Sequence, residues 1–210
     1  MPEWDLSPES RTALATIARQ SVVAAASGCR YTPPREWMVG PLAEPGASFV
    51  TLRAAGELRG CIGSIRARRG LGLDVAENGR AAALRDPRFD PVEAHELAEL
   101  SVELTLLHPP EPLAVGGRAE LLAALVPGVD GLVLEEDGHG ATFLPAVWQQ
   151  LPDPESFVAQ LERKAGLRPG SWSPARRLFR YRAESIAVGP ALEGGEAAAP
   201  LPGQSRRGSR

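Results

Sequence analysis

Two pairs of short strand-like segments, each pair joined by a tight turn, constrain the fold of this chain more than any other feature. The first pair flanks Ala54-Ala55-Gly56, and the second flanks Asp137-Gly138, a dipeptide typical of two-residue hairpins. Turns this short join antiparallel strands, because a parallel pair needs a crossover of a dozen or more residues. The sequence therefore predicts antiparallel sheets. The four segments are residues 48–53, 57–62, 132–135 and 140–144.

Helical patterns are fewer and do not alternate regularly with the strands. Asp74 and Glu77 form the D-x-x-E pattern of a capping box, which predicts that a helix opens there and stops at Asp86-Pro87. Because no βαβ alternation is present, an α+β fold is favoured over a doubly wound sheet. Further helices are expected over residues 8–27, over residues 118–125 and from residue 153 to about 166, and further strands over residues 100–106 and 178–188.

The charge balance excludes several classes of partner. The 210 residues carry a net charge of −3, which provides no field for phosphate backbones or for an anionic membrane surface. No apolar run approaches the ~20 residues that a bilayer-spanning helix needs. The acidic start, Met1-Pro2-Glu3-Trp4-Asp5, lacks the features of a signal peptide. We therefore expect a cytoplasmic protein that binds neither nucleic acid nor membranes, with residues 189–210 as a disordered tail.

The sequence lacks the motifs that bind metals or cofactors. The two cysteines, Cys29 and Cys61, are too few for a disulfide framework, and both should be free thiols in a reducing cytosol. His95, His108 and His139 are scattered and show no zinc-ligand spacing. The sequence contains no P-loop and no dinucleotide fingerprint. It therefore predicts neither a metal nor a cofactor.

Cys61 is the strongest candidate for chemistry. It lies between Gly60 and Gly63, where missing side chains would let a ligand approach the backbone. Arg59, two positions away on the same strand, is expected on the same face, where its guanidinium would favour the thiolate. The competing interpretation is a buried core cysteine, with the glycines marking a β-bulge.

Three further groups have two interpretations each. Asp86 and Arg88 follow a helix end and would either contact an anionic or hydroxylated ligand or form a local salt bridge. Glu103 lies on the polar face of its strand. If that face lines a cleft, Glu103 could act as an acid or a base, and if it faces water, Glu103 is a solvated strand residue. The basic run over residues 65–70 is a solvated loop or a loop that holds a phosphate group.

The chain resembles the AMMECR-type domain, also called protein A of the AmmeMemoRadiSam system. The resemblance is collinear over most of residues 8–188 and is strongest in the string Leu58-Arg59-Gly60-Cys61-Ile62-Gly63. The family signature covers residues 49–52 and 56–64, and the resemblance continues through residues 76–78, 85–89, 102–104, 127–132, 142–145, 147–148, 157, 164–166 and 181.

The resemblance implies two intertwined subdomains within residues 1–188, each an antiparallel sheet with helices, and a cleft between them lined by the signature. The smaller subdomain is expected at residues 46–90. Two partners are implied, a Memo-like protein related to dioxygenases and a radical SAM enzyme, but no settled activity. The polar signature residues that carry over are Arg59, Cys61, Asn78, Asp86, Arg88 and Glu103. We predict a site in which Cys61 and Glu103 are catalytic and a small molecule is bound by Arg59, Gly60, Gly63, Asn78, Asp86 and Arg88.

Two functions follow from these residues. One is a Cys61-dependent enzyme or enzyme component that acts on a small molecule. The other is a non-catalytic adaptor that delivers substrate to the Memo-like partner. A reactive cysteine usually needs a base, and no histidine has an informative spacing to Cys61, which leaves both functions open.

Overall fold

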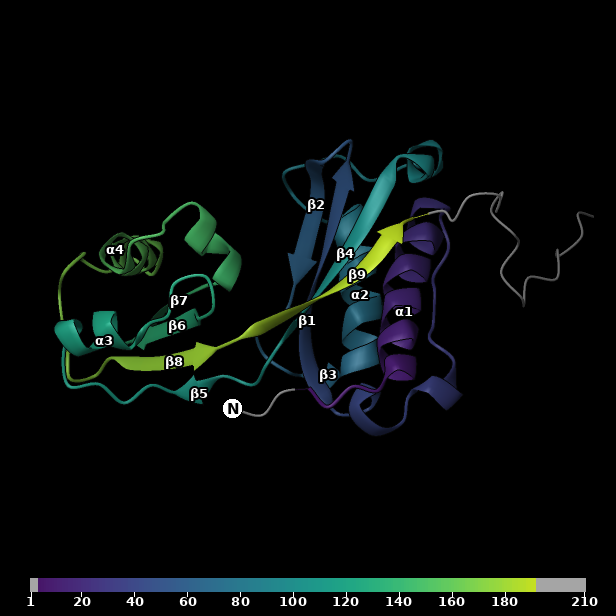
Figure 1. Ribbon diagram of the computed structural model, residues 1–210. Helices are drawn as coiled ribbons and strands as arrows, with labels where there is room; N and C mark the ends of the chain where they lie inside the picture. Colours follow the sequence, from purple (N-terminus) through teal and green to yellow (C-terminus); the bar gives the residue numbers. More distant parts are fainter. Residues whose placement is uncertain (1–3, 192–210) are drawn as a thin grey trace, which may run out of the picture.

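The computed structural model describes residues 4–191, which form two lobes, each built on one antiparallel sheet (Figure 1). The larger sheet has the strand order β2-β1-β4-β9, with β3 paired to β1, and the smaller sheet has the order β5-β8-β6-β7. This arrangement confirms the α+β class. The elements are α1 (Pro8–Ala26), β1 (Pro45–Ala54), β2 (Glu57–Gly63), β3 (Arg69–Gly70), α2 (Leu71–Leu84), β4 (Leu100–Leu107), β5 (Glu111–Pro112), α3 (Arg118–Ala124), β6 (Gly131–Glu136), β7 (His139–Phe143), α4 (Pro154–Lys164), β8 (Arg177–Tyr181) and β9 (Ala183–Pro190).

Helices α1 and α2 cover one face of the larger sheet (Figure 1). Val50, Leu52 and Leu104 point into this layer and are fully buried. Each such side chain contributes about 1.5–3 kcal/mol to folding. Because side chains alternate along a strand, Thr51 and Glu103 point to the other side, which we call the open face.

The smaller lobe packs α4 on the sheet formed by β5, β8, β6 and β7. Phe157 of α4 stacks on Trp148 with ring centroids 3.9 Å apart, and both rings are buried. Asp153 caps the helix, since its side chain accepts a hydrogen bond from the backbone N–H of Ser156. The apolar core of this lobe is a separate cluster from that of the larger lobe.

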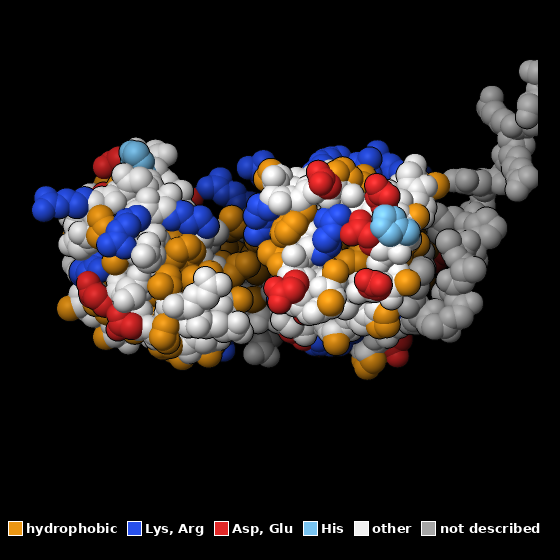
Figure 2. Space-filling model, turned by 90° about the horizontal axis from the view of Figure 1, so that it is seen from above, with side chains coloured by type: hydrophobic (Ala, Val, Ile, Leu, Met, Phe, Trp, Pro, Cys, Tyr) orange, Lys and Arg blue, Asp and Glu red, His pale blue; other side chains and the backbone are white. Residues whose placement is uncertain are grey.

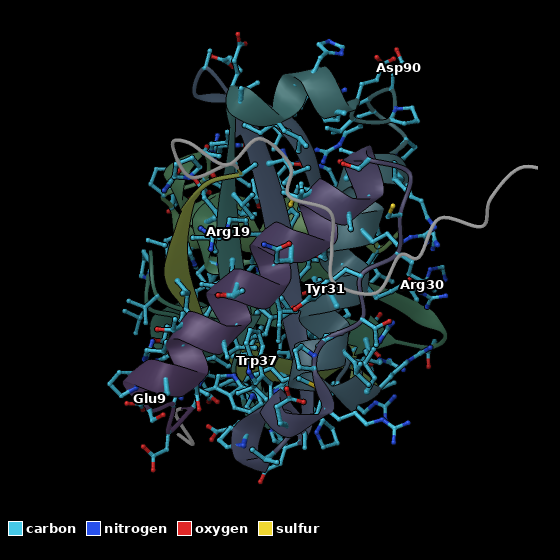
Figure 3. All side chains as sticks on the ribbon, turned by 90° about the vertical axis from the view of Figure 1, so that its right-hand side faces the viewer. Glu9, Arg19, Arg30, Tyr31, Trp37 and Asp90 are labelled. Carbon is cyan, nitrogen blue, oxygen red and sulfur yellow. The ribbon has the colours of Figure 1, made fainter. Side chains whose placement is uncertain are left out.

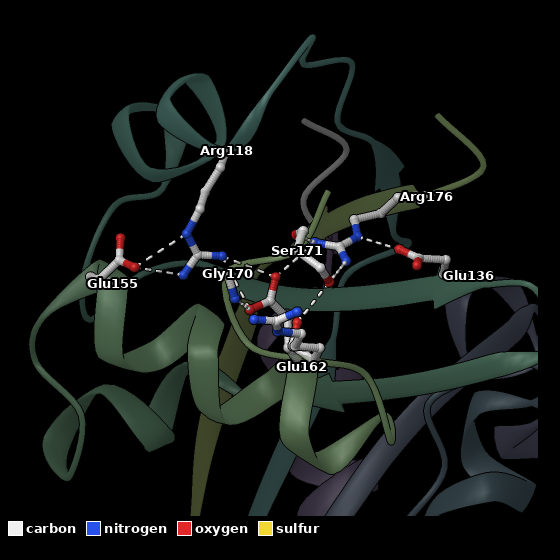
Figure 4. A network of polar contacts seen from close by, with 8 residues as sticks. Arg118, Glu136, Glu155, Glu162, Gly170, Ser171 and Arg176 are labelled. Atoms are coloured by element: carbon white, nitrogen blue, oxygen red, sulfur yellow. Dashed lines mark hydrogen bonds and ion pairs between the residues drawn. The ribbon is translucent and has the colours of Figure 1, made fainter. Parts of the chain in front are cut away.

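A buried ionic network stabilises the smaller lobe (Figure 4). Glu162 is fully buried and accepts hydrogen bonds from Arg118 at 2.9 Å and from Arg176 at 2.7 Å. Arg176 also donates to Glu136 at 2.6 Å, and Arg118 to Glu155 at 2.7 Å. The network joins α3, α4, β6 and the segment before β8.

The two lobes meet through Tyr181, which packs on Ala47 and Leu107 of the larger lobe. One strand was expected over residues 178–188, but β8 and β9 lie in different sheets and separate at Arg182. The carbonyl of Arg182 accepts a hydrogen bond from the backbone N–H of His108, where the chain passes between the lobes.

The boundary between the lobes differs from the one expected. Residues 46–90 lie in the larger lobe, because β1 pairs along its length with β4, about fifty residues later in the chain. The smaller lobe is built from residues 111–181 instead. Of the expected tail, residues 189 and 190 complete β9, and residues 192–210 lie outside the described part of the chain.

The expected capping box at Asp74 is wrong. Helix α2 begins at Leu71, and Asp74 is fully buried in its first turn. Its Oδ2 atom accepts hydrogen bonds from Ser48, Ser64 and Asn78, at 2.7–2.9 Å. The carboxylate therefore joins the helix to the sheet rather than capping the helix.

Across the described residues, every helix is too short or too polar to traverse a lipid bilayer.

Candidate functional site

Cys61 lies on β2, an edge strand of the larger sheet, with its side chain on the open face. It is a free thiol and is partly exposed. The hydroxyl of Thr51, on the neighbouring strand, donates to Cys61 Sγ at 3.3 Å. A donor at this position stabilises negative charge on the sulfur. Cys61 is therefore accessible and polar in its surroundings, unlike a core cysteine.

A β-bulge places Thr51 opposite Cys61. The turn pairs Arg53 with Leu58, and an unbroken register would then pair Thr51 with Gly60. The register shifts between Leu52 and Arg53, so that Thr51 pairs with Cys61. The sequence reasoning missed Thr51, because a bulge is not visible in a hairpin pattern.

Asp86 and Arg88 hold the outer edge of this strand. Asp86 is buried, and its Oδ2 accepts a hydrogen bond from the backbone N–H of Cys61 at 2.8 Å. Arg88 donates to both carboxylate oxygens of Asp86, through Nε at 2.9 Å and Nη2 at 2.7 Å. These hydrogen bonds hold the pKa of Asp86 far below its usual range, Arg88 contributing most. The pKa of Arg88 rises in return, mainly through the same hydrogen bonds.

Arg59 does not contact Cys61, contrary to the same-face expectation. It forms a bidentate pair with Glu96, through Nε at 2.8 Å and Nη2 at 3.0 Å, and Nη1 donates to the carbonyl of Asp90. This pairing lowers the pKa of Glu96. Arg59 is the extra residue of the bulge, and a bulge redirects side chains that simple alternation would align. Its charge is therefore matched by Glu96.

Close packing explains why glycine occupies positions 60 and 63 beside Cys61. A Cβ on Gly60 would lie 2.4 Å from the carbonyl oxygen of Ala82 in α2, and one on Gly63 would lie 2.2 Å from the ring of Phe49. These contacts are too short for any side chain. Close packing, rather than the approach of a ligand, accounts for both residues.

Glu103 shares the open face with Cys61 but does not touch it. Thr51 pairs with Cys61 on one side and with Glu103 on the other, so the two candidates are two strands, or about 10 Å, apart. Glu103 forms an ion pair with Arg53 at 2.9 Å, and half of its side chain is exposed.

Asn78 lies elsewhere. It is buried on α2 and donates to the carbonyl oxygen of Ser48 at 2.9 Å and to Asp74 at 2.8 Å. The structure thus brings Cys61, Asp86 and Arg88 together and leaves Asn78 on the helical side of the sheet, in a network that supports β1.

Two of the three histidines contact groups other than Cys61. His139 contacts the carbonyl of Ala165 in the smaller lobe, and His95 contacts Glu93. Within residues 4–191, no three His, Cys, Asp or Glu side chains are grouped as metal ligands.

A cavity of about 450 Å³ lies between the two lobes. Arg66, Arg68 and Arg69 line one wall, and Glu135 and Thr142 belong to the other. Figure 2 shows basic side chains near the junction of the lobes on the face that it presents. Arg66 crosses the junction to Glu135 at 2.7 Å. The volume suits a small organic ligand.

The expected signature reaches this cavity only at its end. Among the described residues, Ser64 alone of the segment 56–64 lines the cavity, and Cys61 does not. The thiol of the larger lobe and the cavity between the lobes are therefore separate features.

Comparison with known proteins identifies the chain. The AMMECR1 family matches residues 15–186. A protein of Methanothermobacter thermautotrophicus is 39% identical over 138 residues, which are 65% of this chain and 72% of that protein. A protein of Thermococcus gammatolerans is 39% identical over 162 residues, covering 73% and 75%. In a Saccharolobus islandicus relative, 39% identical, the match spans only 60% of its length and 62% of this chain.

The fold has also been seen in a crystal structure. The uncharacterized protein PH0010 from Pyrococcus horikoshii has the same fold, with a TM-score of 0.76 and 30% sequence identity. The similarity covers 86% of this chain and 92% of PH0010. With the match over residues 15–186, this chain belongs to the AMMECR1 family.

Proposed function

We propose that this protein is a cytoplasmic enzyme, or a component of one, that uses the Cys61 thiol on a small molecule. One observation carries the proposal, namely that a free, partly exposed thiol accepts a hydrogen bond from Thr51 on a strand fixed by Asp86. The family resemblance suggests that it acts beside a Memo-like protein and a radical SAM enzyme.

The surrounding groups have distinct roles in this proposal. Thr51 stabilises negative charge on the sulfur, which is the nucleophilic form of cysteine. Arg88 is half exposed, and its Nη1 has no hydrogen bond to another described residue, so it can hold an anionic or hydroxylated part of the substrate. Asp86 stays ionised and positions Arg88 rather than moving protons. Glu103 reaches Cys61 only through a bound molecule or water.

Alkylation of the folded protein at neutral pH tests the thiol, with Cys29 as internal comparison. Cys61 should react faster than Cys29. Thr51→Val, which keeps the shape and removes the hydroxyl, should slow the reaction about two- to tenfold. Arg59→Gln is the control, since Arg59 is paired with Glu96, and should leave the rate unchanged. Protection of Cys61 until the protein unfolds would show a structural thiol and end the proposal.

The adaptor function remains the second candidate, for a specific reason. Within residues 4–191, no His, Asp or Glu side chain hydrogen-bonds Cys61 Sγ, so a general base would have to come from a partner or a substrate. Titration of a purified Memo-like protein under reducing, anaerobic conditions distinguishes the two. Saturable binding that is unchanged in Cys61→Ser, together with full pathway activity of that variant, would favour the adaptor. Loss of activity with unchanged binding would favour the enzyme.

A further inference from the structure

A second, smaller cavity lies on the helical side of the larger lobe, across the sheet from the Cys61 side chain. It has a volume of about 250 Å³ and lies between α2 and the segment that follows α1. Figure 3 views this side and labels Arg30 and Tyr31 on that segment. The lining contains three arginines, Arg30, Arg69 and Arg80, and one carboxylate, Glu77. The formal charge of the lining is therefore positive.

The arginines differ in how their charge is matched. Arg69 pairs with the buried carboxylate of Asp74 at 3.2 Å. Glu77 is shared by Arg30 at 3.9 Å and by Arg85, which lies outside the lining, at 3.5 Å. Arg80 has no carboxylate within ion-pair distance among residues 4–191. One guanidinium of the cavity is thus left without a counter-charge from the described chain.

Hydrogen-bond donors also exceed acceptors in this cavity. The Nε atom of Arg80 is buried and has no acceptor among the described residues. Leaving such a group unsatisfied is costly, so an oxygen from outside the described chain is expected there. The hydroxyl of Tyr31, which also lines the cavity, is a second donor, and burial raises its pKa further above neutral pH. An occupant that brings negatively charged oxygens would satisfy both groups.

The size of the cavity limits the occupant. Sites for organic ligands usually measure about 300–1,000 Å³, and this one is smaller. A tetrahedral oxyanion fits the chemistry, because guanidinium groups bind phosphate oxygens through charge-assisted hydrogen bonds. We propose that this cavity binds a phosphate group, held by Arg80, Arg30 and Tyr31, either as the free ion or as one end of a larger molecule.

Titration with inorganic phosphate at constant ionic strength and pH 7, followed by ¹H–¹⁵N NMR, tests the site. Saturable shifts should be confined to residues 30–33 and 73–80. Arg80→Gln should weaken binding at least about tenfold, and Tyr31→Phe, which removes a single oxygen, about three- to tenfold. Arg163→Gln is the matched control, since Arg163 is an exposed helical arginine of the other lobe, and should bind as the wild type does.

Several outcomes would overturn the proposal. The proposal fails if the wild type shows no saturable shift or if Arg80→Gln binds phosphate as tightly as the wild type. It also fails if Arg163→Gln loses as much affinity as Arg80→Gln. If Arg80→Gln does not fold, Tyr31→Phe decides by the same criterion. A parallel titration with phenyl phosphate separates the sources, because tighter binding of the ester indicates a larger phosphorylated ligand and tighter binding of phosphate indicates the free ion.

Discussion

The two glycines beside Cys61 lie where β2 touches its neighbours most closely. At Gly60 the neighbour is the backbone carbonyl of Ala82 in α2, and at Gly63 the neighbours are the ring of Phe49 and the backbone carbonyl of Ser48. Backbone cannot move aside as a flexible side chain can, so neither position accepts a Cβ without a shift of the main chain. Gly60 determines how closely the sheet and α2 pack, and Gly63 determines how closely Phe49 approaches β2.

Gly60→Ala should therefore lower the free energy of unfolding by about 1–3 kcal/mol, as overpacking typically does. Gly140→Ala is the matched control, because Gly140 also lies in a strand and an added Cβ would find its nearest atom, the Leu134 carbonyl oxygen, at 3.5 Å. Its effect should stay within about 0.5 kcal/mol. Urea denaturation of both variants measures the difference, and equal effects would contradict the packing explanation.

At the scale of elements, β2 is an edge strand whose exposed backbone is occupied by the segment after α2. Asp86 accepts the outward N–H of Cys61, and Arg88 Nη2 lies 3.5 Å from the carbonyl oxygen of Cys61. Unpaired edges invite pairing with other chains, and polar groups placed along them prevent it. The ring of Phe89 lies beneath the guanidiniums of both Arg59 and Arg88, at 6.0 and 5.4 Å.

Asp86→Asn should destabilise the protein by about 1–3 kcal/mol at neutral pH, since a buried, charge-assisted set of hydrogen bonds is lost. The folded state lowers the pKa of Asp86, so its ionised form stabilises the fold above the unfolded-state pKa, and this stabilisation disappears as the pH falls through the folded pKa. The stability gap between wild type and variant should be constant from pH 6 to 8 and shrink below about pH 4. A gap that does not depend on pH would contradict this assignment.

At the scale of the whole molecule, two lobes with separate apolar cores share one chain and a small contact around Tyr181. The smaller lobe depends on a buried carboxylate between two arginines, Arg118 and Arg176 (Figure 4). Removing one partner from such a group leaves uncompensated buried charge. Damage there should remain largely within that lobe.

Glu162→Gln should cost about 3 kcal/mol, and the loss should appear in amide hydrogen exchange of α4 and β6 before that of β1 and β4. Glu155→Gln is the control, because Glu155 pairs with the same Arg118 but is mostly exposed, and its effect should be below about 1 kcal/mol. Uniform loss of protection across both lobes would show that they unfold as one unit.

Sequence patterns predicted the elements well and their long-range partners poorly. Both hairpins, helix α4 and the alternating strand that became β4 are confirmed. The break at Arg182 and the boundary of the smaller lobe were not predicted, because pairing between β1 and β4 is set by contacts about fifty residues apart. The grouping of Cys61, Asp86 and Arg88 followed from the family resemblance, whereas their hydrogen bonds did not.

The sequence by itself determined antiparallel sheets, the α+β class and a free thiol in a glycine-framed strand, because turn chemistry, periodicity and residue type are local properties. Only the tertiary structure decided that Arg59 binds Glu96, that Thr51 faces Cys61 and that Asn78 supports β1 from the helical side. A one-residue bulge redirects Arg59 and aligns Thr51 with Cys61, and the packing of α2 on the sheet places Asn78 beside Ser48. Both features depend on how distant segments pack rather than on the residues nearest in the chain.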